Sequence, residues 1–176
     1  MNKFLTKNFN LSEFSSNDLN DYQVSLLQIL ADNLQVVRDY LQQYAVKGKT
    51  VSVSIRSGVR TQADYVSLKA RGYNPSATSD HFCGLQLLSK PTIGAADIIV
   101  LNCTLNHRQI ANIIRELDLS NKVNFGQIIY ELNPSTGYSW IHLGNDPENV
   151  FTNKIAITRV KYLMSLDNGK SFTALA

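Results

Sequence analysis

This sequence has few cysteines and a small net charge, and each of these features excludes a class of protein. The 176 residues include two cysteines, too few for a disulfide scaffold. The 17 Lys and Arg nearly balance the 14 Asp and Glu, so the net charge of +3 predicts no strong nucleic-acid-binding surface. No apolar run is long enough to span a bilayer. The N-terminus lacks the continuous apolar stretch of a secretory signal, so we expect none.

Histidine is also rare, with three in the whole chain. His107 follows Asn106, which can cap a helix, so we expect His107 to be a solvated or helix-end residue. His142 lies in an alternating run beside Trp140, which is typical of a strand. His81 lies in a turn flanked by serine and glycine. These last two histidines are therefore the candidates for a functional site.

A carboxylate completes a candidate metal site. Asp97 stands at the start of an apolar run, and neutral imidazole and carboxylate are both suitable zinc ligands. A catalytic zinc takes three protein ligands and a water, so we predict that His81, Asp97 and His142 bind one ion. Cys83 lies two residues from His81 and could also ligate zinc, although we favour a small buried filler.

The apolar and polar patterns predict alternating helices and strands. We expect an extended arm at 1–17, helices at 20–44, 62–71 and 106–117, strands at 50–56 and 95–101, and a hairpin of 125–132 with 138–143. In that hairpin Glu131 and His142 share a face if Asn133 pairs with Tyr138, because side chains alternate between the two faces of a sheet.

Several of these stretches together resemble one family. They are Ser79-x-His81-x-x-Gly84, Gly94-Ala95-Ala96-Asp97, Trp140-Ile141-His142, Phe9–Phe14, Ser57–Thr61 and Gln127–Glu131. In this order, over about residues 9 to 144, they are similar to the motifs of the zinc D-alanyl-D-alanine carboxypeptidases. That family includes phage endolysin peptidases and shares its fold with the hedgehog signalling domain.

The resemblance implies an α+β fold with a mostly antiparallel sheet flanked by helices and a metal site on the sheet face. It implies a zinc peptidase-like domain at 1–145 and a C-terminal extension at 146–176 that packs on the same domain. Within the extension we predict a strand at 154–163 and a hairpin at 160–173 around the turn Asp167-Asn168-Gly169.

The resemblance also implies roles around the zinc ion held by His81, Asp97 and His142. Other branches of the family place an acid three residues before the last histidine, where this chain has Ser139. Glu131 is then the expected proton-transfer group, as in the phage-type branch. The alternative for Glu131 is an exposed strand carboxylate.

Three further residues receive roles from the same resemblance. Arg60 is expected to face the site and hold a substrate carboxylate or the oxyanion, against the alternative of a solvated loop cation. Ser79 is expected to contact substrate, or otherwise to bond the local backbone. Trp140 is expected to pack beneath the site.

One departure from the family motif lies between the first two ligands. Fifteen residues, 82–96, separate His81 from Asp97, where the motif has six. The surplus at 85–93 reads as an insertion that a hairpin or loop could absorb while returning Asp97 to the metal.

The expected activity is hydrolysis of peptide bonds in peptidoglycan stem peptides, of either the D-Ala-D-Ala or the L-Ala-D-Glu type. We expect a phage-encoded enzyme, made in the host cytoplasm and acting on the cell wall or carried in a virion. The rival is a catalytically impaired structural module of a phage tail or baseplate that binds other virion proteins. A regulatory peptide-binding protein is a third alternative.

Overall fold

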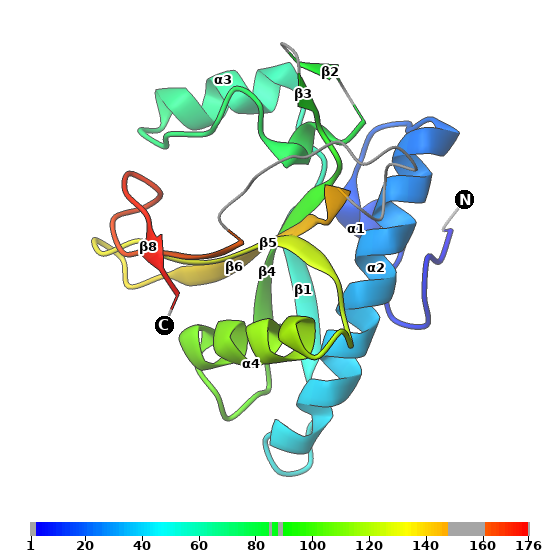
Figure 1. Ribbon diagram of the computed structural model, residues 1–176, viewed down its shortest axis with the longest axis vertical. Coiled ribbons are helices and arrows are strands. Elements are labelled where there is room, and N and C mark those ends of the chain that lie inside the picture. The colour runs from blue at the N-terminus through cyan, green and yellow to red at the C-terminus, as the bar shows by residue number, and fades with distance from the viewer. Residues whose placement is uncertain (1–2, 85, 88–89, 148–160, 176) are drawn as a thin grey trace.

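The computed structural model describes residues 3–84, 86–87, 90–147 and 161–175, and it has an α+β architecture (Figure 1). A six-stranded sheet with the order β1-β4-β6-β5-β7-β8 forms its centre. The strands are β1 (Ser52–Ser57), β4 (Ala95–Leu101), β5 (Phe125–Leu132), β6 (Ser139–Asn145), β7 (Tyr162–Ser165) and β8 (Thr173–Ala174).

The sheet is mixed rather than uniformly antiparallel. β1, β4, β6 and β5 follow one another in antiparallel pairs, as expected. β7 then pairs with β5 in parallel, and β8 returns antiparallel to β7. The predicted sheet flanked by helices is therefore confirmed, and its parallel pair comes from the part of the chain that we expected to be an extension.

Within the described residues, four α-helices surround the sheet, α1 (Leu11–Phe14), α2 (Asp21–Leu41), α3 (Gln62–Ala70) and α4 (His107–Leu119), and a short 3-10 helix, η1 (Gln42–Tyr44), continues α2. The longer three begin where predicted, and each has a capping box, for which Asn20, Thr61 and Asn106 supply the cap. The expected extended arm is wrong at α1, because Asn10 and Glu13 form a capping box there as well.

The two faces of the central strands differ in chemistry. Alternate residues of β4, β5 and β6 enter one hydrophobic core with α2 and α4, as Ile98, Ile128 and Ile141 illustrate. The residues between them point to the opposite face, and they include Asp97 and His142. The α2 and α4 core thus fixes the register that presents the candidate site residues together.

The insertion between His81 and Asp97 projects as a hairpin. β2 (Gln86–Leu87) and β3 (Lys90–Pro91) pair antiparallel in a separate two-stranded sheet. At its base the Gly84 amide donates to the Thr92 carbonyl at 2.7 Å, and the Gly94 amide donates to the Asp80 carbonyl at 3.1 Å. The two ends of the insertion therefore lie close together, as predicted, and β4 starts beside the turn that contains His81.

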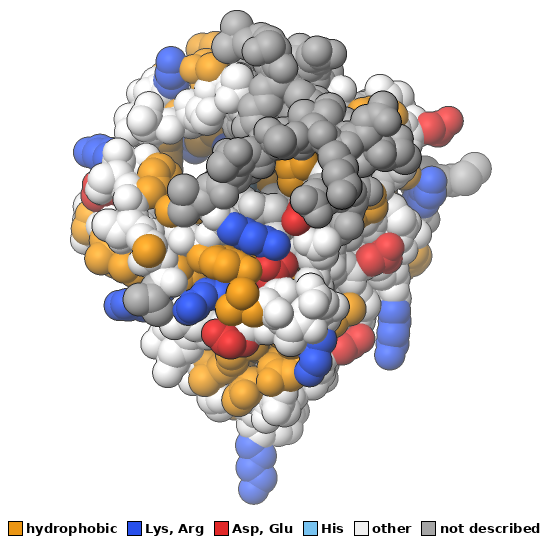
Figure 2. Space-filling view, viewed as in Figure 1, with side chains coloured by type: hydrophobic (Ala, Val, Ile, Leu, Met, Phe, Trp, Pro, Cys, Tyr) orange, Lys and Arg blue, Asp and Glu red, His pale blue; other side chains and the backbone are white. Residues whose placement is uncertain are grey.

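The C-terminal segment joins the same sheet. The predicted hairpin is confirmed over the described residues, since β7 and β8 pair with Met164 opposite Thr173. Most of the strand predicted at 154–163 lies outside the described residues. In the part of the chain that is described, no helix is long and apolar enough to cross a membrane. On the face shown in Figure 2, acidic and basic side chains are interspersed.

Candidate metal centre

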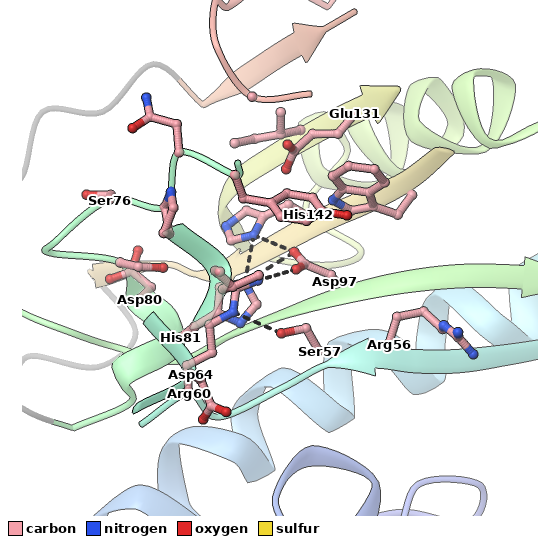
Figure 3. Close-up of a pocket in the computed structure, with 18 of the residues that line it drawn as sticks. Arg56, Ser57, Arg60, Asp64, Ser76, Asp80, His81, Asp97, Glu131 and His142 are labelled. Atoms are coloured by element: carbon pink, nitrogen blue, oxygen red, sulfur yellow. Dashed lines mark hydrogen bonds and ion pairs between the residues drawn. The ribbon is translucent and has the colours of Figure 1, made fainter. Parts of the chain in front are cut away.

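His81, Asp97 and His142 converge on one point (Figure 3). Asp97 on β4 stands directly opposite His142 on β6 in the sheet register, and His81 comes from the 3-10 turn η2 (Asp80–Phe82). The Asp97 Oδ1 atom lies 2.9 Å from His142 Nδ1 and 3.2 Å from His81 Nε2. The two ring nitrogens are 3.1 Å apart. All three side chains are buried.

Backbone contacts fix the orientation of the His81 ring. Its Nδ1 lies 2.7 Å from the Gly58 carbonyl, which can only accept, so Nδ1 carries the proton. When the ring is neutral, its Nε2 lone pair faces Asp97 and His142; when the ring is protonated, Nε2 donates to Asp97. Gly58 lies so close to Phe14 that an added Cβ would lie 2.2 Å from the Phe14 carbonyl oxygen. This glycine therefore allows the close packing that positions His81.

Charge in the centre is concentrated on Asp97. Its Oδ2 forms an ion pair with Arg60 at 2.5 Å, while Oδ1 faces both imidazoles. Burial alone would raise the pKa of Asp97, but the His81 charge and hydrogen bonds from both histidines hold it well below its usual range. The centre therefore contains a carboxylate that stays ionised near neutral pH.

The two histidines differ in their pKa. Burial lowers the pKa of His81, in spite of the attraction of Asp97. Burial would also lower the pKa of His142, but the hydrogen bond and charge of Asp97 outweigh it and raise that pKa. His81 is thus the better lone-pair donor at neutral pH.

The three donor atoms fit a small metal ion. A tetrahedral zinc with bonds of about 2.0–2.1 Å needs its ligand atoms roughly 3.3 Å apart. The separations of 2.9–3.2 Å between the three atoms approach that value without a change of rotamer. The hydrogen bond of His81 to a backbone carbonyl is also the kind of contact that orients metal-bound imidazoles. The buried group could therefore bind a metal ion.

Glu131 lies on the same face of the sheet, beside the trio. The Asn133 amide donates to the Tyr138 carbonyl at 2.8 Å, which is the register required to bring Glu131 and His142 to one face. Glu131 stands opposite Trp140 in the pairing of β5 with β6. Burial, followed by the charge of Asp97, raises the pKa of Glu131 to about 7. The alternative of an exposed strand carboxylate is wrong.

A cleft of about 1120 Å³ opens over the centre. Arg60, Ser79 and Trp140 all line it. The Arg60 side chain is 17% exposed and also donates from Nε to Ser57 Oγ at 3.0 Å. Arg60 is therefore not the solvated cation of the alternative interpretation. Arg56, also in the lining, points away from the trio (Figure 3).

The remaining histidine and Cys83 lie outside the trio. His107 begins α4, as expected, and its ring connects β4 to β6: Nε2 accepts from the Val100 amide, and Nδ1 lies 2.9 Å from the Ser139 carbonyl. Cys83 is fully buried in the core, and burial raises the pKa of its thiol to about 12. The interpretation of Cys83 as a buried filler is confirmed.

One side of the cleft was not predicted from the sequence. Leu163, Asn168, Gly169 and Phe172 line it from β7 and the loop after it. The turn itself was visible as Asp167-Asn168-Gly169, but nothing in its local sequence indicated that β7 would pair with β5. A long-range strand pairing of this kind has no short-range signal.

Comparison with known proteins gives no significant match to a family model, a curated protein or a solved structure.

Proposed function

We propose that this chain is a zinc-dependent peptidase that hydrolyses peptide bonds in the stem peptides of bacterial peptidoglycan. The observation that carries the proposal is the convergence of His81, Asp97 and His142 within 3.2 Å of one another, at the floor of a cleft that also contains Glu131 and Arg60. Two imidazoles, one carboxylate and a separate acid are the set that a hydrolytic zinc site requires.

A bound zinc ion would act as a Lewis acid that polarises the scissile carbonyl and makes an attacking water acidic near neutral pH. Glu131 takes a proton from that water and delivers it to the amide nitrogen as the C–N bond breaks. A pKa of about 7 suits both transfers, because the group can bind and release a proton near neutrality. Glu131 and its cross-strand neighbour Trp140 both line the cleft.

Arg60 supplies positive charge beside the reacting carbonyl. A guanidinium has five N–H donors, and Ser57 and Asp97 use two of them. The others can hold either a developing oxyanion or a substrate carboxylate. Either the D-Ala-D-Ala or the L-Ala-D-Glu bond is the proposed site of cleavage. Ser79, which lines the cleft, is the proposed contact to the substrate.

Digestion of purified stem peptides with added zinc tests the proposal. We expect the wild type to release the terminal or internal fragment, and His142→Ala to lose at least about 1000-fold in kcat/KM because a ligand is missing. His107→Ala is the matched control: that ring lies outside the trio, so cleavage should persist. Absence of cleavage by the zinc-loaded wild type, or equal cleavage by His142→Ala, contradicts the proposal.

A second candidate is a catalytically impaired module of a phage particle. The Arg60–Asp97 ion pair favours it, because the guanidinium already neutralises the carboxylate that would attract a cation. In that case the trio and Arg60 act as a buried polar network that stabilises the fold. Stoichiometric incorporation into virions without zinc binding or cleavage supports the module, whereas cleavage excludes it.

A further inference from the structure

The loop between β7 and β8, residues 166–172, forms the wall of the cleft nearest to Glu131. Asn168, Gly169 and Phe172 of this loop line the cleft. β7 leads into it in parallel with β5, so that Ser165 stands beside Glu131 in the register. The C-terminal segment therefore contributes directly to the surroundings of the proposed proton-transfer group.

The loop holds its shape through its own hydrogen bonds. The carboxylate of Asp167 accepts from the backbone amides of Lys170 at 3.1 Å and Ser171 at 2.9 Å. The Ser165 hydroxyl donates to Asp167 at 2.9 Å and accepts from the Gly169 amide at 2.9 Å. These bonds fix the position of Gly169 relative to β7.

Two contacts join the loop to the Glu131 segment. The Asn168 amide donates to the carbonyl of Leu132, the residue after Glu131, at 3.0 Å. A Cβ added to Gly169 would lie 3.2 Å from Glu131 Oε2, which is closer than ordinary van der Waals contact. Gly169 also has a φ of 78°, in the left-handed region that favours glycine. The Glu131 side chain thus has Gly169 on one side and its cross-strand neighbour Trp140 beside it.

We infer that Gly169 is a positioning residue: its backbone, fixed by Ser165 and Asp167, holds the Glu131 carboxyl against Trp140 in the orientation needed for proton transfer. The inference rests on the proposed function for its kinetic consequence, but the contact itself is independent of metal and substrate. An element outside the resemblance to the carboxypeptidase family would then help to set the geometry of the reaction.

Gly169→Ala tests the inference, with Gly137→Ala as its matched control. Both glycines have a left-handed φ, of 78° and 69°, but a Cβ at Gly137 meets nothing within 4 Å. The two variants therefore share the backbone strain, and only the first moves Glu131. We expect Gly169→Ala to lower kcat about 10- to 100-fold with KM changed less than about twofold, and Gly137→Ala to leave both nearly unchanged.

A spectroscopic readout separates this inference from the proposed function. Trp140 is the only tryptophan, so the chain gives one indole N–H signal by NMR. Glu131→Gln defines the signal when the neighbouring side chain carries no carboxylate. Gly169→Ala should move the wild-type signal toward that position in the metal-free protein, and Gly137→Ala should not. An indole signal unchanged in Gly169→Ala overturns the inference, whatever the activity of the wild type.

Ser165→Ala keeps the test decisive if Gly169→Ala fails to fold. It removes the hydroxyl that accepts from the Gly169 amide and adds no atom near Glu131. We expect a smaller displacement of the indole signal in the same direction and a fall in kcat of about two- to tenfold. No displacement in this folded variant contradicts the inference.

Discussion

Two buried carboxylates in this protein, Asp97 and Asp118, are almost equally hidden from solvent, yet their surroundings are opposite. Asp118 accepts from the Phe125 amide at 2.8 Å and the Tyr162 hydroxyl at 2.7 Å, and it pairs with the Lys161 ammonium at 2.8 Å. Every one of these partners is a hydrogen donor. Asp118 therefore joins the end of α4 to β5 and to the segment that begins β7, and the cation it shares with Asp146 is the Lys161 ammonium.

Asp97 instead faces two imidazoles, at least one of which presents a lone pair. The hydrogen bond of His81 Nδ1 to the Gly58 carbonyl directs Nε2 toward the carboxylate. Burial and ion pairing are thus common to both aspartates, but of the two only Asp97 belongs, among the described residues, to a group of three His and Asp donor atoms close enough to share one ion. The comparison teaches that the neighbours' lone pairs, rather than burial, distinguish a candidate metal centre from a structural ion pair.

The largest expected difference between the two aspartates is in zinc affinity. Asp97→Asn removes the charge of a ligand with little change in shape, so zinc should bind at least about 100-fold more weakly. Asp118→Asn should bind zinc as the wild type does. Competition with a chromophoric chelator measures both affinities. Equal zinc affinity in Asp97→Asn and the wild type would show that Asp97 is no more a metal ligand than Asp118.

The next effect concerns stability without metal. Asp118→Asn loses charge-assisted bonds to the amide, hydroxyl and ammonium, so we expect a loss of about 1.5–3 kcal/mol in the free energy of unfolding. Urea denaturation at pH 7 measures it, with Asn106→Ala, which removes the α4 cap, as a reference of about 1 kcal/mol. A loss no larger than that of the cap variant would show that Asp118 contributes little.

A third effect is the pH dependence due to Glu131. Its pKa is raised from 4.5 to about 7 in the folded chain, so the folded state binds more protons than the unfolded state between these values. Its contribution to stability is complete below pH 4.5 and is lost as the pH rises through about 7. In the metal-free protein, the unfolding free energy of the wild type minus that of Glu131→Gln should fall across this window. A difference that stays flat with pH would contradict the raised pKa.

Local patterns predicted most of the fold. The helix starts at Asn20, Thr61 and Asn106 follow from capping residues, and β4 matches its apolar run residue for residue. The convergence of the three predicted ligands also agrees with the structure. The pairing of β4 with β6 places Asp97 opposite His142, the hairpin register adds Glu131 to the same face, and His81 comes from the η2 turn.

The parts that sequence reasoning missed depend on distant contacts. The parallel pairing of β7 with β5 joins segments about 30 residues apart and makes the C-terminal loop a wall of the cleft. Likewise, the sequence indicated Arg60 as a cation at the site, but not that its guanidinium would bind Asp97. Such pairings are selected by tertiary packing, which leaves little trace in the neighbouring residues.

The zinc content of the purified protein tests the central claim most directly. The chain is incubated with excess zinc, dialysed against metal-free buffer and analysed by mass spectrometry for metal, beside His142→Ala treated in the same way. The account predicts one zinc per chain in the wild type and none in the variant, since the ion would need both imidazoles and Asp97. A wild type that retains no zinc, or a variant that retains as much, would contradict it.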